Sequence, residues 1–175
     1  QDLFDNRHAN YAGDVGIGIN PQLLKRIQSA DLLIAVGARL SEMTTQGYTL
    51  LDIPRPKQKL VHVHADAGEL GKVYQTDLPI NASMPEFCAA LKVLTPVNVV
   101  WKAWCEEAHA DYLENAKPVS IPGALQMHQV METLRKRLPA DAIITNGAGN
   151  FATWAHRYHT YTGFRTQLAP TNGAM

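Results

Sequence analysis

The 175-residue sequence has few cysteines and no excess of either charge. Cys88 and Cys105 are its two cysteines; they lie far apart and outside a C-x-x-C pair, so neither a disulfide framework nor a cysteine-based zinc site is expected. Sixteen basic residues balance sixteen acidic ones, which argues against the basic surface of a nucleic-acid-binding protein.

Signals for membrane insertion and export are also missing. No apolar stretch approaches the roughly 18 residues that a membrane-spanning helix needs. The first ten residues, QDLFDNRHAN, lack the basic and apolar regions of a signal peptide. We find no internal repeat and no low-complexity tract. We therefore expect a soluble, cytoplasmic protein with no membrane or nucleic-acid partner.

Helix-like and strand-like segments alternate over the first 95 residues. Asn20 and Pro21 begin a predicted helix over 19–30, and the apolar run 32–36 predicts a strand that is covered on both faces. Further segments predict a strand, a short strand and a closing helix over 59–66, 77–83 and 84–94. This alternation predicts an α/β fold built on a parallel sheet.

The second half begins with a predicted connector helix over roughly 98–114. Residues 125–139 then carry apolar side chains at helical spacing (Leu125, Val130, Leu134 and Leu138), and 141–146 read as a strand. We divide the chain into a central, nucleotide-binding-like domain (1–95), a linker with a helix (96–120) and the first part of a second α/β domain (121–175).

Both of these domains look incomplete. Three strands are few for a doubly wound sheet, and the last segment stops after the turn-like APTNGAM with no helix to cover its strand. A parallel sheet needs both faces buried. We therefore expect the sequence to be a fragment of a longer polypeptide.

The stretch DAIITNGAGNFATWAHRYH, residues 141–159, reads as strand, glycine turn and helix. Glycines let backbone N–H groups approach an anion, and the N-terminus of a helix adds partial positive charge. The sequence therefore suggests a phosphate-binding turn. An ordinary strand-to-helix turn, with Asn150 as the helix cap, is the alternative reading.

Taken together, these segments resemble the thiamine-diphosphate-dependent enzymes of the acetolactate synthase type. ADLLIAVGARL and LVHVHADAGELGKVY resemble the second half of that family's Rossmann-like central domain. IPGALQMHQVMETLRKRLPADAIITNGAGNFATWA and APTNGAM resemble the start of its diphosphate-binding domain. The resemblance covers essentially the whole chain and rests on the order and spacing of these motifs.

The resemblance implies a set of cofactor-binding positions in the glycine turn. Contacts to the diphosphate would fall on Ala148, Gly149, Asn150 and Phe151. The synthases usually carry a Gln-His pair where this chain has Asn150 and Phe151, so backbone contacts are expected to persist better than side-chain contacts.

A second implied contact lies in TNGAM. In the family, a glycine carbonyl accepts a hydrogen bond from the cofactor's aminopyrimidine, and a large apolar side chain keeps the cofactor bent. The matching residues are Gly173 and Met175. Methionine suits such a wedge because it fills irregular apolar gaps.

The function that the resemblance implies is a thiamine-diphosphate- and Mg²⁺-dependent lyase or transferase. Its substrate would be a small 2-oxo acid, and its chemistry decarboxylation with or without carboligation, in a homo-oligomer (dimer or tetramer). The Mg²⁺ motif would lie beyond Met175, and the activating glutamate before Gln1. No catalytic residue or metal ligand is therefore assigned here, and the fragment by itself is expected to be inactive.

Binding of FAD, which some relatives carry, is not expected. Gly37 and Arg39 match the start of the synthase flavin motif, but Ser41, Met43 and His64 replace its charged positions. His62 and His64 share a strand face, yet two ligands are too few for a four-coordinate zinc site.

Two other readings of the chain remain open. It could be a non-catalytic nucleotide-binding α/β module, since fold alone does not define function. It could also be an inactive product of proteolysis or folding.

Overall fold

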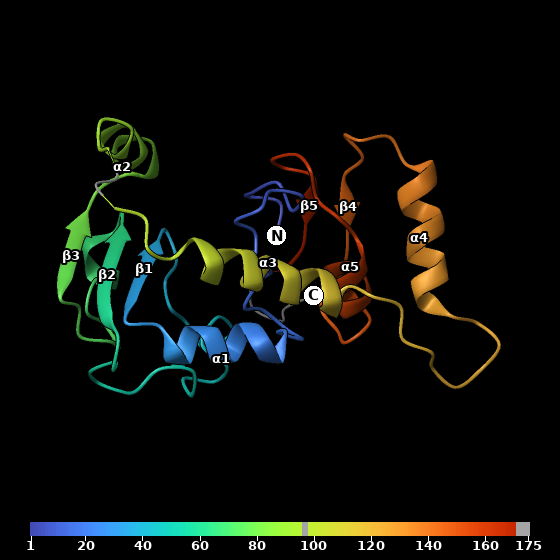
Figure 1. Ribbon diagram of the computed structural model, residues 1–175, viewed down its shortest axis with the longest axis horizontal. Helices are drawn as coiled ribbons and strands as arrows, with labels where there is room; N and C mark the ends of the chain where they lie inside the picture. The colour runs from blue at the N-terminus through green and yellow to red at the C-terminus, as the bar shows by residue number, and fades with distance from the viewer. Residues whose placement is uncertain (96–97, 171–175) are drawn as a thin grey trace. The chain divides into compact units, whose positions relative to one another are not determined.

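The computed structural model describes residues 1–95 and 98–170 of the chain (Figure 1). No helix in these ranges is both long enough and apolar enough to cross a membrane. Contacts between residues divide the chain into two compact units, Leu24–Val100 and the combination of Gln1–Leu23 with the chain from Trp101 onward.

The unit Leu24–Val100 is built on a parallel sheet of three strands, β1 (Leu32–Val36), β2 (Lys59–His64) and β3 (Leu78–Asn81). The strands lie in chain order; Ile34 of β1 is opposite Val61, and Val63 of β2 is opposite Ile80. This arrangement confirms the predicted α/β fold with a parallel sheet.

The core of this unit lies on one face of the sheet. Ala35 and Leu60 are buried there together with residues from the following loops: Leu40, Leu50, Leu51 and Tyr74. Leu24 and Ile27 of α1 (Pro21–Ser29) pack against the same cluster. Asn20 caps this helix, because its Oδ1 accepts a hydrogen bond from the Gln22 N–H at 3.0 Å.

The expectation that β1 is covered on both faces was wrong. Leu32, Ile34 and Val36 are 46%, 54% and 43% exposed. Successive side chains of a strand point to opposite faces, so these three share the face opposite Ala35. Helix α1 and the loops cover only the Ala35 face, whereas α2 (Met84–Leu91) starts against the end of β1, where Met84 Sδ lies near Gly37.

The two strand histidines belong to the fold. His62 is 2% exposed, and its Nε2 lies 2.7 Å from the backbone oxygen of Ala38. A buried ring nitrogen needs such a partner. His62 therefore ties β2 to the loop after β1.

The other unit joins the N-terminal segment to the second half of the chain. It contains α3 (Lys102–Asn115), α4 (Met127–Arg137), β4 (Ile144–Thr145), α5 (Ala152–Tyr158) and β5 (Gln167–Leu168). Asn6 and Tyr161 hold the segments together through two hydrogen bonds of 2.9 Å. The domain boundaries at 95 and 120 stay predictions; contacts group the first 23 residues with the later part of the chain.

Helix α4 buries a different residue from those that the spacing suggested. Met131 is buried, whereas Leu125 and Leu134 are exposed. Apolar spacing identifies a helix but does not reveal how much of its apolar face a partner covers.

Candidate functional site

The predicted glycine turn follows a short strand and precedes a short helix. β4 is shorter than predicted and pairs in parallel with β5, with Ile144 opposite Gln167 and Thr145 opposite Leu168. The turn therefore leaves the carboxyl end of a parallel pair. That is the end of a parallel sheet where ligands bind in open α/β folds.

Gly149 is the position in this turn that requires glycine. Its φ is +148°, a conformation that residues with a side chain rarely adopt. A Cβ at this position would lie 2.8 Å from Cε1 of the Phe151 ring. At Gly147 a Cβ would lie 3.7 Å from the same ring, which is an ordinary van der Waals contact. A side chain is therefore tolerated at Gly147 but not at Gly149.

Backbone donors at the turn remain available to a ligand. The N–H groups of Ala152, Thr153 and Trp154 bond to carbonyls three residues earlier. Those of Ala148, Gly149 and Asn150 make no hydrogen bond with any residue that the structure describes. Several unpaired N–H groups before a helix are the donors that an anion accepts from.

Asn150 does not act as the helix cap. The capping position of α5 is Phe151, and no side chain caps it. The Asn150 backbone oxygen instead accepts from Thr153 Oγ1 at 2.6 Å. The structure therefore does not support the part of the alternative interpretation in which Asn150 caps the helix.

A hollow of about 430 Å³ adjoins the turn. Its described lining comprises Thr145, Asn146, Gly147, Leu168, Ala169 and Pro170, from the ends of both strands. The buried Oδ1 of Asn146 has no partner among the described residues, while its Nδ2 donates to the Gly147 oxygen at 3.1 Å. The free backbone donors and the strand-end position fit the diphosphate of a cofactor, whereas the Asn146 oxygen, itself an acceptor, needs a donor instead.

Two of the expected cofactor contacts, Gly173 and Met175, lie outside the described residues. Within 1–95 and 98–170, no group of three or more His, Cys, Asp or Glu side chains could hold a metal ion.

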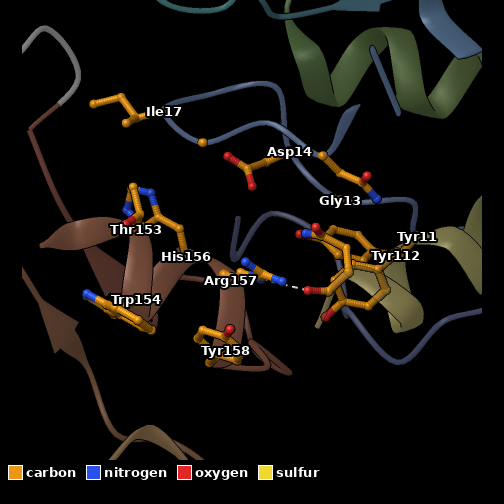
Figure 2. Close-up of a pocket in the computed structure, with 13 residues that line it drawn as sticks. Tyr11, Gly13, Asp14, Ile17, Tyr112, Thr153, Trp154, His156, Arg157 and Tyr158 are labelled. Atoms are coloured by element: carbon orange, nitrogen blue, oxygen red, sulfur yellow. Dashed lines mark hydrogen bonds between the residues drawn. The ribbon is translucent and has the colours of Figure 1, made fainter. Parts of the chain in front are cut away.

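A second cavity, of about 300 Å³, lies on the body of α5 (Figure 2). Tyr11, Asp14 and Ile17 come from the N-terminal loop, Tyr112 from α3, and His156 from α5. The His156 ring extends from the helix toward the loop that carries Asp14 and Ile17 (Figure 2). Its walls combine aromatic rings with charged and amide groups.

His156 is the most unusual group in this cavity. Neither of its ring nitrogens has a partner among the described residues, and burial lowers its pKa. The Asp14 carboxylate accepts a hydrogen bond from the Gly16 N–H at 3.2 Å. A neutral imidazole and a carboxylate can together hold a small polar molecule that both donates and accepts.

Asp14 and His156 were not among the site residues predicted from the sequence. Asp14 and His156 lie far apart in the sequence and match no spacing rule. They come together only because the N-terminal loop packs beside α5, and no local sequence pattern signals that packing.

The chain is similar in sequence to a known enzyme family and to several of its members. Residues 1–91 match the family model described as "Thiamine pyrophosphate enzyme, central domain". The chain is 31% identical over 174 residues to the acetolactate synthase large subunit of Corynebacterium glutamicum. This alignment covers 94% of this chain and 27% of that protein. An acetolactate synthase of Mycobacterium avium is 28% identical with the same coverages.

A differently named relative is also similar to this chain. The sulfoacetaldehyde acetyltransferase of Alcaligenes xylosoxydans xylosoxydans is 25% identical over 198 aligned positions, covering 97% of this chain and 33% of that protein. The chain thus spans about a quarter to a third of the length of these relatives. The family match over more than half of the chain, on a parallel α/β sheet, shows that the chain belongs to the thiamine pyrophosphate enzyme family.

Proposed function

We propose that the chain forms part of an enzyme that uses thiamine diphosphate and Mg²⁺ to act on a 2-oxo acid. The family match carries this proposal, and the acetolactate synthases aligned over 94% of the chain support it. The chemistry would be decarboxylation with or without carboligation, in a homo-oligomer. The acetyltransferase among the relatives leaves the choice between lyase and transferase open.

The glycine turn would hold the diphosphate. The unpaired N–H groups of Ala148, Gly149 and Asn150 would donate to its oxygens, with the start of α5 adding partial positive charge. Gly173 and Met175 would contact the aminopyrimidine. Bound thiamine diphosphate supplies an electron sink for the substrate's carbon centre.

We assign no residue of this chain as a metal ligand, because the family resemblance would put the Mg²⁺ motif beyond Met175. We also propose that no FAD binds the central domain, since Ser41, Met43 and His64 replace charged contacts of the flavin motif. Flavin absorbance bands that survive dialysis of the purified protein would contradict this.

The decisive test of the proposal is a calorimetric titration. The protein carrying all the segments of its relatives should bind thiamine diphosphate saturably with Mg²⁺, and should lose that binding when EDTA removes the metal. ADP provides the comparison. Saturable binding of ADP without binding of thiamine diphosphate would instead identify a nucleotide-binding module.

A further inference from the structure

A third cavity, of about 470 Å³, lies in the unit that contains β4 and β5, away from the glycine turn. It is bounded by Arg135 and the residues that follow α4, by residues after α5, and by Arg7 of the N-terminal segment. No acidic side chain lines it, although two arginines and a histidine do. This imbalance of charge distinguishes it from the Asp14–His156 cavity.

The two arginines contribute differently. Arg7 is held by Asp5, whose carboxylate oxygens accept from its Nε at 3.0 Å and its Nη2 at 2.8 Å. Its other guanidinium donors remain, but its charge is balanced. Arg135 forms no ion pair with any acid in the described residues; the nearby Glu132 pairs with Lys136 at 2.8 Å. Arg135 therefore supplies the positive charge of the cavity.

His159 adds an unsatisfied polar group to the same wall. Its Nδ1 is buried without a partner among the described residues. Burial and the neighbouring Arg135 lower its pKa, so the ring is neutral and can donate from one nitrogen. The Tyr161 ring packs edge-on against it at 4.6 Å between centroids, which fixes its orientation.

Part of the lining is apolar. Leu138, Pro139, Ala140 and Ala142 come from the segment between α4 and β4. A ligand in this cavity could thus meet cationic and polar donors as well as aliphatic carbon. The volume is within the usual range for small-molecule sites.

We propose that this cavity binds the oxyanion of a short-chain carboxylate, with the carboxylate on Arg135 and His159 and the alkyl chain on the Pro139–Ala142 wall. Guanidinium groups pair with carboxylates through charge-assisted hydrogen bonds. An anion could pair with the exposed guanidinium of Arg135, and an acceptor atom would satisfy the buried His159 nitrogen. The site is separate from the proposed cofactor turn and does not depend on it.

Solution NMR on the full chain tests the proposal, with sodium butyrate, acetate and phosphate as probes at an ionic strength held constant with chloride. Butyrate should give saturable shifts at His159 and at Thr162, whose side chain also lines the cavity. Each buried methylene should tighten binding by up to about fourfold, so butyrate should bind more tightly than acetate. Shifts of equal size with chloride alone would overturn the proposal, and tighter binding of phosphate than of butyrate would overturn the carboxylate assignment.

Arg135→Gln should weaken butyrate binding by about tenfold, the effect of losing one charged hydrogen-bond partner. Arg137→Gln is the matched control, because Arg137 lies on the same helix but does not line the cavity. An equal loss of butyrate affinity in the two variants would overturn the proposal, because it would show that only the net positive charge of the helix attracts the anion. Thr162→Val, which keeps the charge, provides a second variant if Arg135→Gln does not fold; unchanged affinity and unchanged shifts in it would then count against the site.

Discussion

At the scale of single residues, two glycines of one turn have different roles. Gly149 combines a positive φ with close approach of the Phe151 ring, whereas a methyl group at Gly147 meets only an ordinary contact. The donors beside Gly149 are the ones that we assign to the diphosphate. A side chain at this position would therefore displace both the ring and the donors.

We predict that Gly149→Val weakens binding of thiamine diphosphate by the protein that carries the complete cofactor site, by at least about tenfold, and that Gly147→Ala changes it little. Calorimetry measures both. Unchanged affinity in Gly149→Val would mean that the turn does not contact the cofactor.

The buried imidazole of His156 predicts a dependence of stability on pH. Burial lowers its pKa in the folded state, so below about pH 6.5 the unfolded chain binds the proton that the folded chain resists. The stabilising contribution is complete above that pH and is lost as the pH falls through it toward the lower, folded-state pKa. His159 is shifted in the same direction.

The denaturation midpoint should therefore drop between pH 7.5 and pH 5.5, and His156→Gln should reduce the drop. The exposed His8 provides the matched variant, His8→Gln, in which the drop should persist. An equal drop in wild type and His156→Gln would contradict the assignment.

At the scale of elements, helix α2 depends on its first turn. The Ser83 backbone N–H and Oγ–H both donate to Glu86 Oε2, at 3.3 Å and 2.8 Å. These bonds satisfy polar groups that the start of a helix otherwise leaves to water. The Ser83 oxygen in turn accepts from the Phe87 N–H at 3.0 Å.

Glu86→Ala should lower the free energy of unfolding by about 1 kcal/mol, and Glu86→Gln by less, because glutamine keeps one acceptor oxygen. Chemical denaturation gives both values, and hydrogen exchange at Phe87 reports whether the helix start opens. Equal losses in the two variants would show that the capping bonds are not the cause.

At the scale of the whole molecule, the sheet presents an apolar surface. Leu32, Ile34 and Val36 are exposed on one face, and among the described residues β1 pairs with β2 alone, so its other edge has no strand partner there. Such edges recruit further strands.

We predict that the chain self-associates. Light scattering should give masses above the 19.3 kDa of one chain, rising with concentration. Ile34→Lys should lower the mass, whereas Val93→Lys, at an exposed position outside the sheet, should not. A monomer at every concentration would contradict the prediction.

The 175-residue chain alone should not bind thiamine diphosphate saturably, even with Mg²⁺. Each N–H contact at an exposed helix start contributes only about 0.3–1 kcal/mol. No cluster of three or more His, Cys, Asp or Glu side chains in the described residues could hold a metal ion to neutralise the diphosphate, and association itself costs free energy. Tight binding in calorimetry at micromolar protein would show that the metal site has been misplaced.

Some features of this protein follow from sequence alone. The apolar run at 32–36 coincides with β1, Asn20 caps the helix it was expected to cap, and the alternation of elements predicted the parallel sheet. These features depend on neighbours along the chain, where side-chain period and capping chemistry act directly. The family resemblance is likewise a matter of motif order.

Tertiary structure alone decided the rest. Which face of β1 is covered depends on where α1 and the loops pack. The sequence of the strand is equally consistent with one covered face or two, so it could not predict the outcome. The Asp14–His156 and Arg135–His159 cavities join residues that no local pattern links. The sequence does not distinguish Gly147 from Gly149. Only Gly149 requires glycine, because of its backbone φ angle and the nearby Phe151 ring. The angle and the ring position are both set by how the turn folds onto α5.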